Sequence, residues 1–176
     1  MLRATAFPAA ALAALLWSPA SAQSADPGPD AGAMRASLDS CLEAAEDRAG
    51  DEACIGGPSS ACMDAPGGES TMGMSGCLGA ETEAWDAILN SLWPQVKAAA
   101  AEGDAADMPQ EMGLPTQAET LIAAQRAWIA FRDADCLHAY AMAGTGSIRQ
   151  IEGASCRLSA TAMRVLDFRE WLRPGP

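Results

Sequence analysis

The stretch Ala124–Cys136, AQRAWIAFRDADC, decides the fold class. Trp128 lies one helical turn before Arg132, while Ile129, Arg132 and Cys136 follow a neighbouring row at three- and four-residue steps. This spacing predicts an α-helix that packs Trp128 and Ile129 into a core and places Arg132 beside Cys136 on one face. The arginines, aspartates and cysteine of the stretch suit either a functional constellation or the framework of a small helical domain.

Helical periodicity continues on both sides of this stretch. A broad apolar stripe predicts a long helix around Pro94, which should kink or break it, because proline removes a backbone donor and crowds the carbonyl four residues earlier. Thr116 and Glu119 match a capping box, so the next helix begins there and ends near Gly144. A last helix is expected over about 154–171. The sequence therefore predicts an all-α fold: a small bundle of three main helices plus one or two short ones, stapled by disulfides.

Composition divides the chain into four segments. Residues 1–22 match a secretory signal peptide, which predicts a periplasmic or secreted protein. Residues 23–33 are small, polar and rich in Pro and Gly, and are expected to be a disordered leader. Residues 34–76 form a Cys-rich N-terminal elaboration, in which a short helix over 34–50 precedes a long loop without apolar periodicity. Residues 77–173 form the main helical domain.

All six cysteines follow the signal peptide, and an even number in an oxidising compartment predicts disulfides. Six cysteines permit 15 connectivities. The short spacings favour Cys136–Cys156 and Cys54–Cys62, which leaves Cys41 with Cys77. Such bridges would tie down the long N-terminal loop, which would otherwise be unusual in a compact domain.

The composition is strongly acidic. The chain carries 23 Asp and Glu residues against 11 Lys and Arg residues, a formal net charge of −12, which becomes −13 without Arg3 of the signal peptide. This balance argues against nucleic acid as a partner, because no basic surface displaces counterions from phosphates. It favours solubility and steers encounters with cationic proteins. No apolar run reaches the roughly 20 residues that a membrane-spanning helix needs, so membrane insertion is not expected.

Signals for catalysis are weak. His138, the one histidine, would have to serve any cysteine or serine nucleophile as its base, while the cysteines are expected to be oxidised. The sequence therefore predicts a non-enzymatic protein without a cofactor. One alternative is a copper site through Met72, Met74, His138 and Met142, since thioether and imidazole ligands suit copper. Methionines that fill gaps, and a shared helix face, are the simpler interpretation.

A network of charged side chains is expected to fix the register of the main helices. Arg132 would lie beside Trp128 and bind a carboxylate on the preceding helix, and Asp133 would bind Arg164 on the last helix. The network comprises Trp128, Arg132, Asp133, Arg164 and Asp86, with Glu83 as the alternative carboxylate.

Three sequence patches, in this order, match the pattern of a known family. The first is CLGAETEAWDAILN, Cys77–Asn90, and the second is A-Q-x-x-W-x-x-F-R-D-x-x-C over 124–136. The third is CRLSATAMR, Cys156–Arg164, and the turn GTGSI, Gly144–Ile148, is also similar. Together they resemble the LprI-type lysozyme inhibitor domain of exported bacterial proteins. Pro94 and the three additional cysteines before the first patch depart from the family pattern.

The resemblance implies a helical, disulfide-bonded envelope protein with residues 77–173 as its LprI-like domain. It also implies a partner: a lysozyme or another cationic cell-wall hydrolase, whose active-site cleft the protein would occlude. Asp104, Asp107 and Glu111, in an acidic connector expected to be exposed, are candidate contacts. The alternative is a general envelope or stress protein without inhibitory activity.

Overall fold

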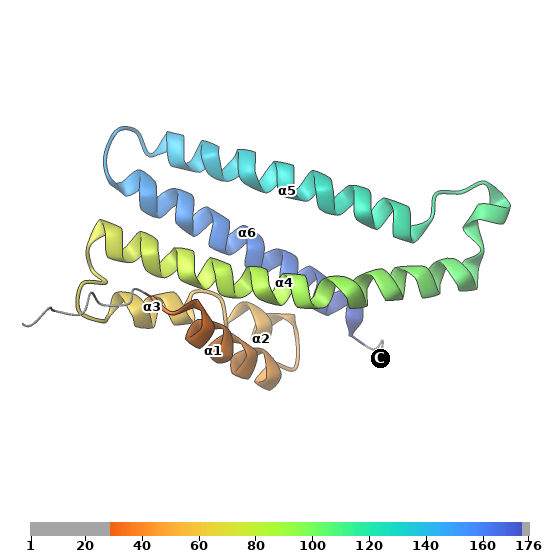
Figure 1. The fold of residues 1–176 in the computed structure, drawn as a ribbon, viewed down its shortest axis with the longest axis horizontal. Helices are drawn as coiled ribbons and strands as arrows, with labels where there is room; N and C mark the ends of the chain where they lie inside the picture. The colour runs from red at the N-terminus through yellow and green to blue at the C-terminus, as the bar shows by residue number, and fades with distance from the viewer. Residues whose placement is uncertain (1–28, 174–176) are drawn as a thin grey trace, which may run out of the picture.

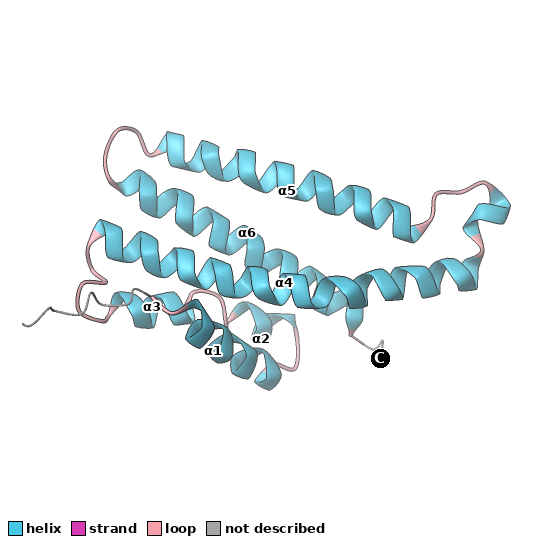
Figure 2. Ribbon diagram, in the orientation of Figure 1, coloured by secondary structure: helices cyan, strands magenta, loops and turns pink. Residues whose placement is uncertain are grey.

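The computed structural model describes residues 29–173, so the predicted signal peptide and most of the predicted leader lie outside the described residues. The described part contains six α-helices, one 3-10 turn and no β-strand, and the all-α prediction is confirmed (Figure 2). The elements are α1 (Ala31–Ala44), α2 (Arg48–Glu52), α3 (Gly57–Met63), α4 (Thr71–Asp107), η1 (Pro109–Met112), α5 (Gln117–Met142) and α6 (Ile148–Leu172).

Three long helices form the body of the molecule. The connection through η1 joins α4 to α5 at one end, and the loop of residues 143–147 joins α5 to α6 at the other end (Figure 1). Helix α6 packs against both α4 and α5. Helices α1, α2 and α3 lie on the side of α4 and α6 that faces away from α5 (Figure 1). The side of α4 and α6 toward α5 is therefore left without cover from the N-terminal helices.

Helix α4 is longer than the sequence predicts. It begins at Thr71, where the Ser70 side chain accepts a hydrogen bond of 2.9 Å from the Gly73 backbone N–H, and it continues through Pro94 to Asp107. Of the kink or break predicted at Pro94, the break is absent, because the helix is continuous there. Pro94 and Asn90 are both exposed, so water can replace the donor that the Asn90 carbonyl loses.

The long loop predicted over 51–76 is also wrong, because the segment contains the end of α2, all of α3 and the start of α4. Helices α2 and α3 are stabilised by hydrogen bonds at their N-termini and lack a continuous apolar stripe. The Asp47 side chain caps α2 at the Gly50 N–H, at 2.8 Å. Two backbone N–H groups at the start of α3, those of Gly56 and Ser59, each donate to the Glu81 carboxylate at 2.8 Å.

Consecutive cysteines pair in the structure, as Cys41–Cys54, Cys62–Cys77 and Cys136–Cys156. The last pair is the one that the spacing favoured, but the expected pairs Cys54–Cys62 and Cys41–Cys77 are wrong. Their cysteines lie on segments that fold back onto different neighbours. The turn after α2 returns to α1, with 5.9 Å between the two Cα atoms, and α3 lies along the start of α4, with 5.7 Å between the Cα atoms.

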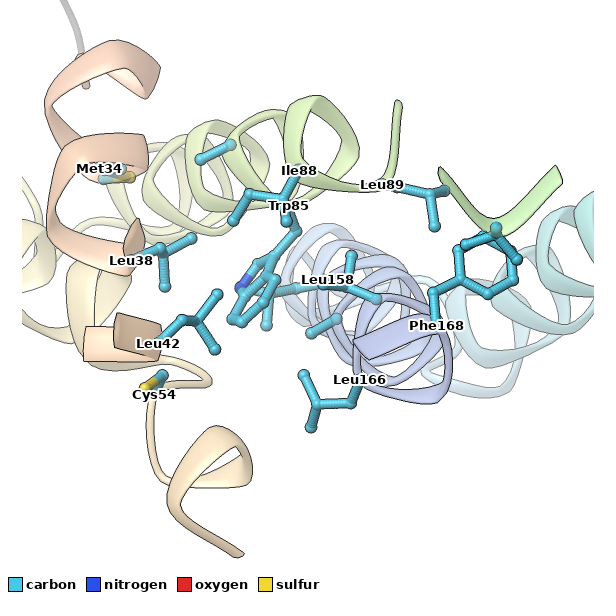
Figure 3. Close-up of a cluster of buried hydrophobic side chains, with 14 of the residues drawn as sticks. Met34, Leu38, Leu42, Cys54, Trp85, Ile88, Leu89, Leu158, Leu166 and Phe168 are labelled. Atoms are coloured by element: carbon cyan, nitrogen blue, oxygen red, sulfur yellow. The ribbon is translucent and has the colours of Figure 1, made fainter. Parts of the chain in front are cut away.

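One hydrophobic core joins the N-terminal helices to the long ones. Trp85 of α4 is fully buried between Leu38 and Leu42 of α1 and Leu158 and Leu166 of α6 (Figure 3). Such burial stabilises by roughly 1.5–3 kcal/mol per large apolar side chain. Helices α1 and α6 therefore pack against the same tryptophan of α4, which joins them into one core.

Helix α5 contributes less to this core. Its buried side chains are Leu121, Gln125 and Cys136, and only Leu121 joins the apolar cluster. Trp128 packs against the cluster while half-buried, but Ile129 is 41% exposed, so its predicted place in the core is wrong. The contact face of α5 runs along the row of its three buried residues, and Ile129 lies on the flank of that row. No helix of the described part is long and apolar enough to cross a membrane.

Candidate functional site: the groove between α4 and α5

A groove runs along the seam between α4 and α5, with α6 as its floor. Its middle hollow has a volume of about 410 Å³. Polar side chains from all three helices line the hollow: Thr82, Glu83, Asp86 and Asn90 from α4, Arg132 from α5, and Arg157 and Thr161 from α6, together with Ala87. This α4–α5 groove brings together several residues of the predicted network.

Two further hollows extend the groove toward its ends. One, of about 340 Å³, shares Asn90 with the middle hollow and includes Trp93 and Ile129. The other, of about 430 Å³, shares Arg157 and reaches Tyr140 near the α5–α6 turn. The shared residues place the three hollows next to one another between the long helices.

Arg132 occupies the α5 wall of the middle hollow. Its guanidinium lies 5.0 Å from the centre of the Trp128 ring, and its Nη2 atom is 2.9 Å from a carboxylate oxygen of Asp133. The expected ion pair of Arg132 with Glu83 or Asp86 is wrong: both carboxylates line the same hollow, but in residues 29–173 neither forms an ion pair with it. The adjacent Asp133 binds the guanidinium instead, while Trp128 holds it by stacking.

The expected pair of Asp133 with Arg164 is also wrong. Arg164 donates from Nε to the Gln125 side-chain oxygen at 2.9 Å, and its guanidinium lies 4.6 Å from the Phe168 ring centre. Burial lowers the pKa of Arg164, and the nearby Asp167 partly opposes this effect. The basic residue of α6 that approaches Asp133 is Arg157, one to two turns earlier, at 3.8 Å. Arg164 therefore belongs to the packing beneath the groove.

The α4 wall carries two carboxylates without a basic partner. Glu83 is exposed and Asp86 is half-buried, and Asp86 accepts a hydrogen bond of 2.9 Å from the Asn90 amide. Among the ion pairs of the described residues, none includes either carboxylate.

Thr161 lies in the floor of the hollow. It is fully buried, and its Oγ1 atom has no hydrogen-bond partner. A buried hydroxyl without a partner is uncommon and costs the free energy of its lost hydration. An unpaired hydroxyl therefore lies buried beneath the hollow.

The acidic connector is placed differently from the prediction. Asp104 is only 8% exposed, and its carboxylate accepts from the backbone N–H groups of Gln117 at 2.6 Å and Ala118 at 2.9 Å. Its predicted role as an exposed contact is therefore wrong, since it caps α5. Asp107 and Glu111 are exposed, as expected.

The residues of the copper alternative lie on two helices. Met72 is 84% exposed at the start of α4, near Met74, and Met142 is 73% exposed on α5, where His138 is also exposed. Within residues 29–173, no three His, Cys, Asp or Glu side chains gather as metal ligands. Copper binding through the two methionine-containing pairs stays a prediction.

Sequence reasoning missed four polar members of the middle hollow, Thr82, Asn90, Arg157 and Thr161. The sequence contained a signal for Asn90. Glu83, Asp86 and Asn90 follow each other at three- and four-residue steps, as a polar row beside the apolar stripe of α4. Polar rows beside core stripes on neighbouring helices indicate a shared groove, but which helices are neighbours is known only from the fold.

Comparison with known proteins gives one match. The family model described as "Lysozyme inhibitor LprI" matches residues 62–168, which include α4, α5 and most of α6. No curated protein and no solved structure matches the chain.

Proposed function

The chain belongs to the LprI lysozyme inhibitor family, and we propose on this basis that it is an exported, non-enzymatic protein that binds a lysozyme and occludes its active-site cleft. The matched segment carries the proposal, because it contains every wall of the α4–α5 groove and the Cys62–Cys77 and Cys136–Cys156 bridges. Three disulfides in so small a chain support export, since such bridges persist in oxidising compartments.

Charge supports a cationic target. The matched segment contains 14 acidic residues against six basic ones, and two of the acidic side chains, Glu81 and Asp104, are buried as caps. The remaining acidic surface attracts basic proteins and raises their association rate. Many lysozymes are strongly cationic, so such an encounter is favourable.

Occlusion of the cleft is an inhibition mechanism that requires no catalytic groups in the inhibitor. Glycan-cleaving enzymes hold a pair of carboxylic side chains in an open cleft, and the glycan must reach both of them. A rigid protein that covers the cleft prevents this approach without any chemistry of its own. The disulfides and the shared core make this chain suitably rigid for binding at a low entropic cost.

The test is lysozyme activity on bacterial cell walls with the purified, oxidised protein added. We expect inhibition at micromolar concentrations or below, stronger at low salt than at physiological salt because charge attraction is screened. Full lysozyme activity at both salt concentrations would overturn the proposed function.

A further inference from the structure

We propose that the middle hollow of the α4–α5 groove receives a lysine or arginine side chain of the inhibited hydrolase. This inference rests on the proposed function and deepens it, because it assigns the contact surface and the chemical group that the surface recognises. It depends on three observations: two unpaired carboxylates, a wall of two arginines that Asp133 partly neutralises, and a buried unpaired hydroxyl.

The carboxylates of Glu83 and Asp86 face the hollow from α4 without an ion-pair partner in the described part of the chain. They are three residues apart on one helix face, so a single cation can reach both. A cation in a partly enclosed hollow interacts with them more strongly than in bulk water, because the local dielectric constant is lower.

The opposite walls do not repel such a cation as strongly as two arginines normally would. Arg132 lies 2.9 Å from the Asp133 carboxylate, and Arg157 lies 3.8 Å from the same group. The lining by itself balances at zero, with two carboxylates and two guanidinium groups, and Asp133, which lies beside the hollow, adds one negative charge. One lysine or arginine side chain would neutralise it.

The floor gives the site its specificity. The Thr161 hydroxyl is buried beneath the hollow and unpaired, so a cationic side chain that displaces the atoms covering it gains a hydrogen-bond acceptor. Thr82 and Ala87 line the hollow beside the carboxylates and offer methyl groups to the aliphatic stem. A long, flexible cationic side chain matches this combination of stem contacts and a polar floor.

The first experiment compares two double variants with equal charge change. Glu83→Gln with Asp86→Asn removes both carboxylates of the hollow, and Glu102→Gln with Asp107→Asn removes two exposed carboxylates at the far end of the same helix. We expect the Kd for a cationic lysozyme to rise about tenfold or more in the first variant and about threefold or less in the second. Equal losses in both variants would show general charge attraction and would overturn the inference.

The second experiment replaces Thr161 with Val, which removes the hydroxyl and keeps the shape. Because the hydroxyl has no partner in the free protein, we expect an unchanged or higher melting temperature together with a Kd raised about fivefold or more. A purely structural role predicts the opposite pattern. Unchanged affinity in a folded Thr161→Val protein would overturn the role of the Thr161 hydroxyl as acceptor for the bound cation.

A third experiment separates this inference from the proposed function. n-Butylammonium chloride, which mimics a lysine side chain, is titrated into the oxidised protein while backbone amide NMR signals are followed. We expect saturable shifts at residues of the hollow, which the Glu83→Gln, Asp86→Asn variant loses and the Glu102→Gln, Asp107→Asn variant keeps. This result without lysozyme inhibition would overturn only the proposed function, whereas inhibition without these shifts would overturn the hollow as the cation site.

Discussion

Glu81 is a carboxylate at zero exposure that accepts three hydrogen bonds from the protein. One oxygen accepts from the Gly56 N–H at 2.8 Å and the Trp85 indole N–H at 3.0 Å, and the other accepts from the Ser59 N–H at 2.8 Å. The side chain therefore caps α3 and orients the central tryptophan at once. A buried charge is tolerated here because three donors replace its hydration.

Replacing Glu81 with Gln should destabilise the protein by about 2–4 kcal/mol, because the amide nitrogen then faces a donor and two charge-assisted hydrogen bonds weaken. Urea unfolding of the oxidised protein measures this loss. Glu83→Gln, two residues along the same helix but exposed, is the matched control and should change stability by less than about 0.5 kcal/mol. Equal stability of the two variants would contradict the capping role of Glu81.

Asp51 connects α2 to the last helix in a similar way. It is fully buried, and its two oxygens lie 3.0 Å from Arg169 and 2.6 Å from Arg173. Both arginines are partly exposed, so solvent screens the pairs and the full value of a buried ion pair does not apply. Asp51→Asn should still cost about 2 kcal/mol, since the amide donates toward two donors.

The same urea measurement checks the Asp51 prediction. Asp39→Asn, which removes an exposed i,i+4 pair with Arg35, should cost about 0.5 kcal/mol or less. A larger effect at Asp39 than at Asp51 would show that burial of the α2–α6 contact does not matter.

At the scale of elements, α5 is held most firmly at its ends. Thr116 caps its first turn at the Glu119 N–H, at 3.1 Å, as the capping box predicted, and Asp104 of α4 binds the N–H groups of Gln117 and Ala118. The other end is tied by the Cys136–Cys156 bridge to α6. Between these ends, few apolar side chains of α5 are buried.

Asp104→Ala should therefore loosen the start of α5. We expect a stability loss of about 1–2 kcal/mol, because two backbone donors lose a charged acceptor. Hydrogen exchange should accelerate in the first turn of α5 before the rest of the helix. Asp107→Ala, at an exposed position three residues later, is the control. Unchanged exchange in the first turn would contradict the capping by Asp104.

Sequence could predict α4 and α6 because each buries a continuous apolar stripe, and it could predict the start of α5 because Thr116 and Glu119 are close in sequence. It could not predict α3, whose N-terminal cap is Glu81, more than 20 residues away along the chain. The wrong cysteine pairs have the same origin. Spacing alone favours Cys54–Cys62, whereas the fold brings Cys54 to α1 and Cys62 to α4.

Part of the middle hollow was predictable, namely Glu83, Asp86 and Arg132, but its ion pairs were not. Trp128, Arg132 and Asp133 are adjacent as predicted, but the ion-pair partners on other helices depend on rotation about each helix axis. The Arg132 guanidinium remains with Asp133 although Asp86 lines the same hollow, so the rotation angle of each helix, together with side-chain packing, decides the partner. Periodicity does not determine that angle; packing of the whole bundle does.

On the scale of the whole molecule, three disulfides close loops of 13, 15 and 20 residues. Each such bridge stabilises by about 3 kcal/mol through the unfolded chain. Their sum is comparable to the roughly 5–15 kcal/mol total stability of an ordinary domain. Reduction should therefore lower the urea midpoint strongly, with α1–α3 losing protection from hydrogen exchange first. A reduced protein as stable as the oxidised one would contradict this prediction.

The acidic surface should act on the rate of encounter, and the hollow on the lifetime of the complex. Exposed charges interact over about one Debye length, which is roughly 10 Å at 0.1 M salt. We therefore expect the association rate constant with a cationic lysozyme to fall about tenfold between low and physiological salt, while the dissociation rate constant changes little.

Association and dissociation rates of the two double variants, measured by surface plasmon resonance, separate these two contributions. Glu102→Gln with Asp107→Asn removes exposed charge and should slow association modestly at low salt without changing dissociation. Glu83→Gln with Asp86→Asn should also accelerate dissociation, about tenfold, because the bound cationic side chain loses its partners. An association rate independent of salt would contradict steering by the acidic surface. Equal dissociation rates for both variants would place the specific contact outside the hollow, since only a group buried at the interface delays separation.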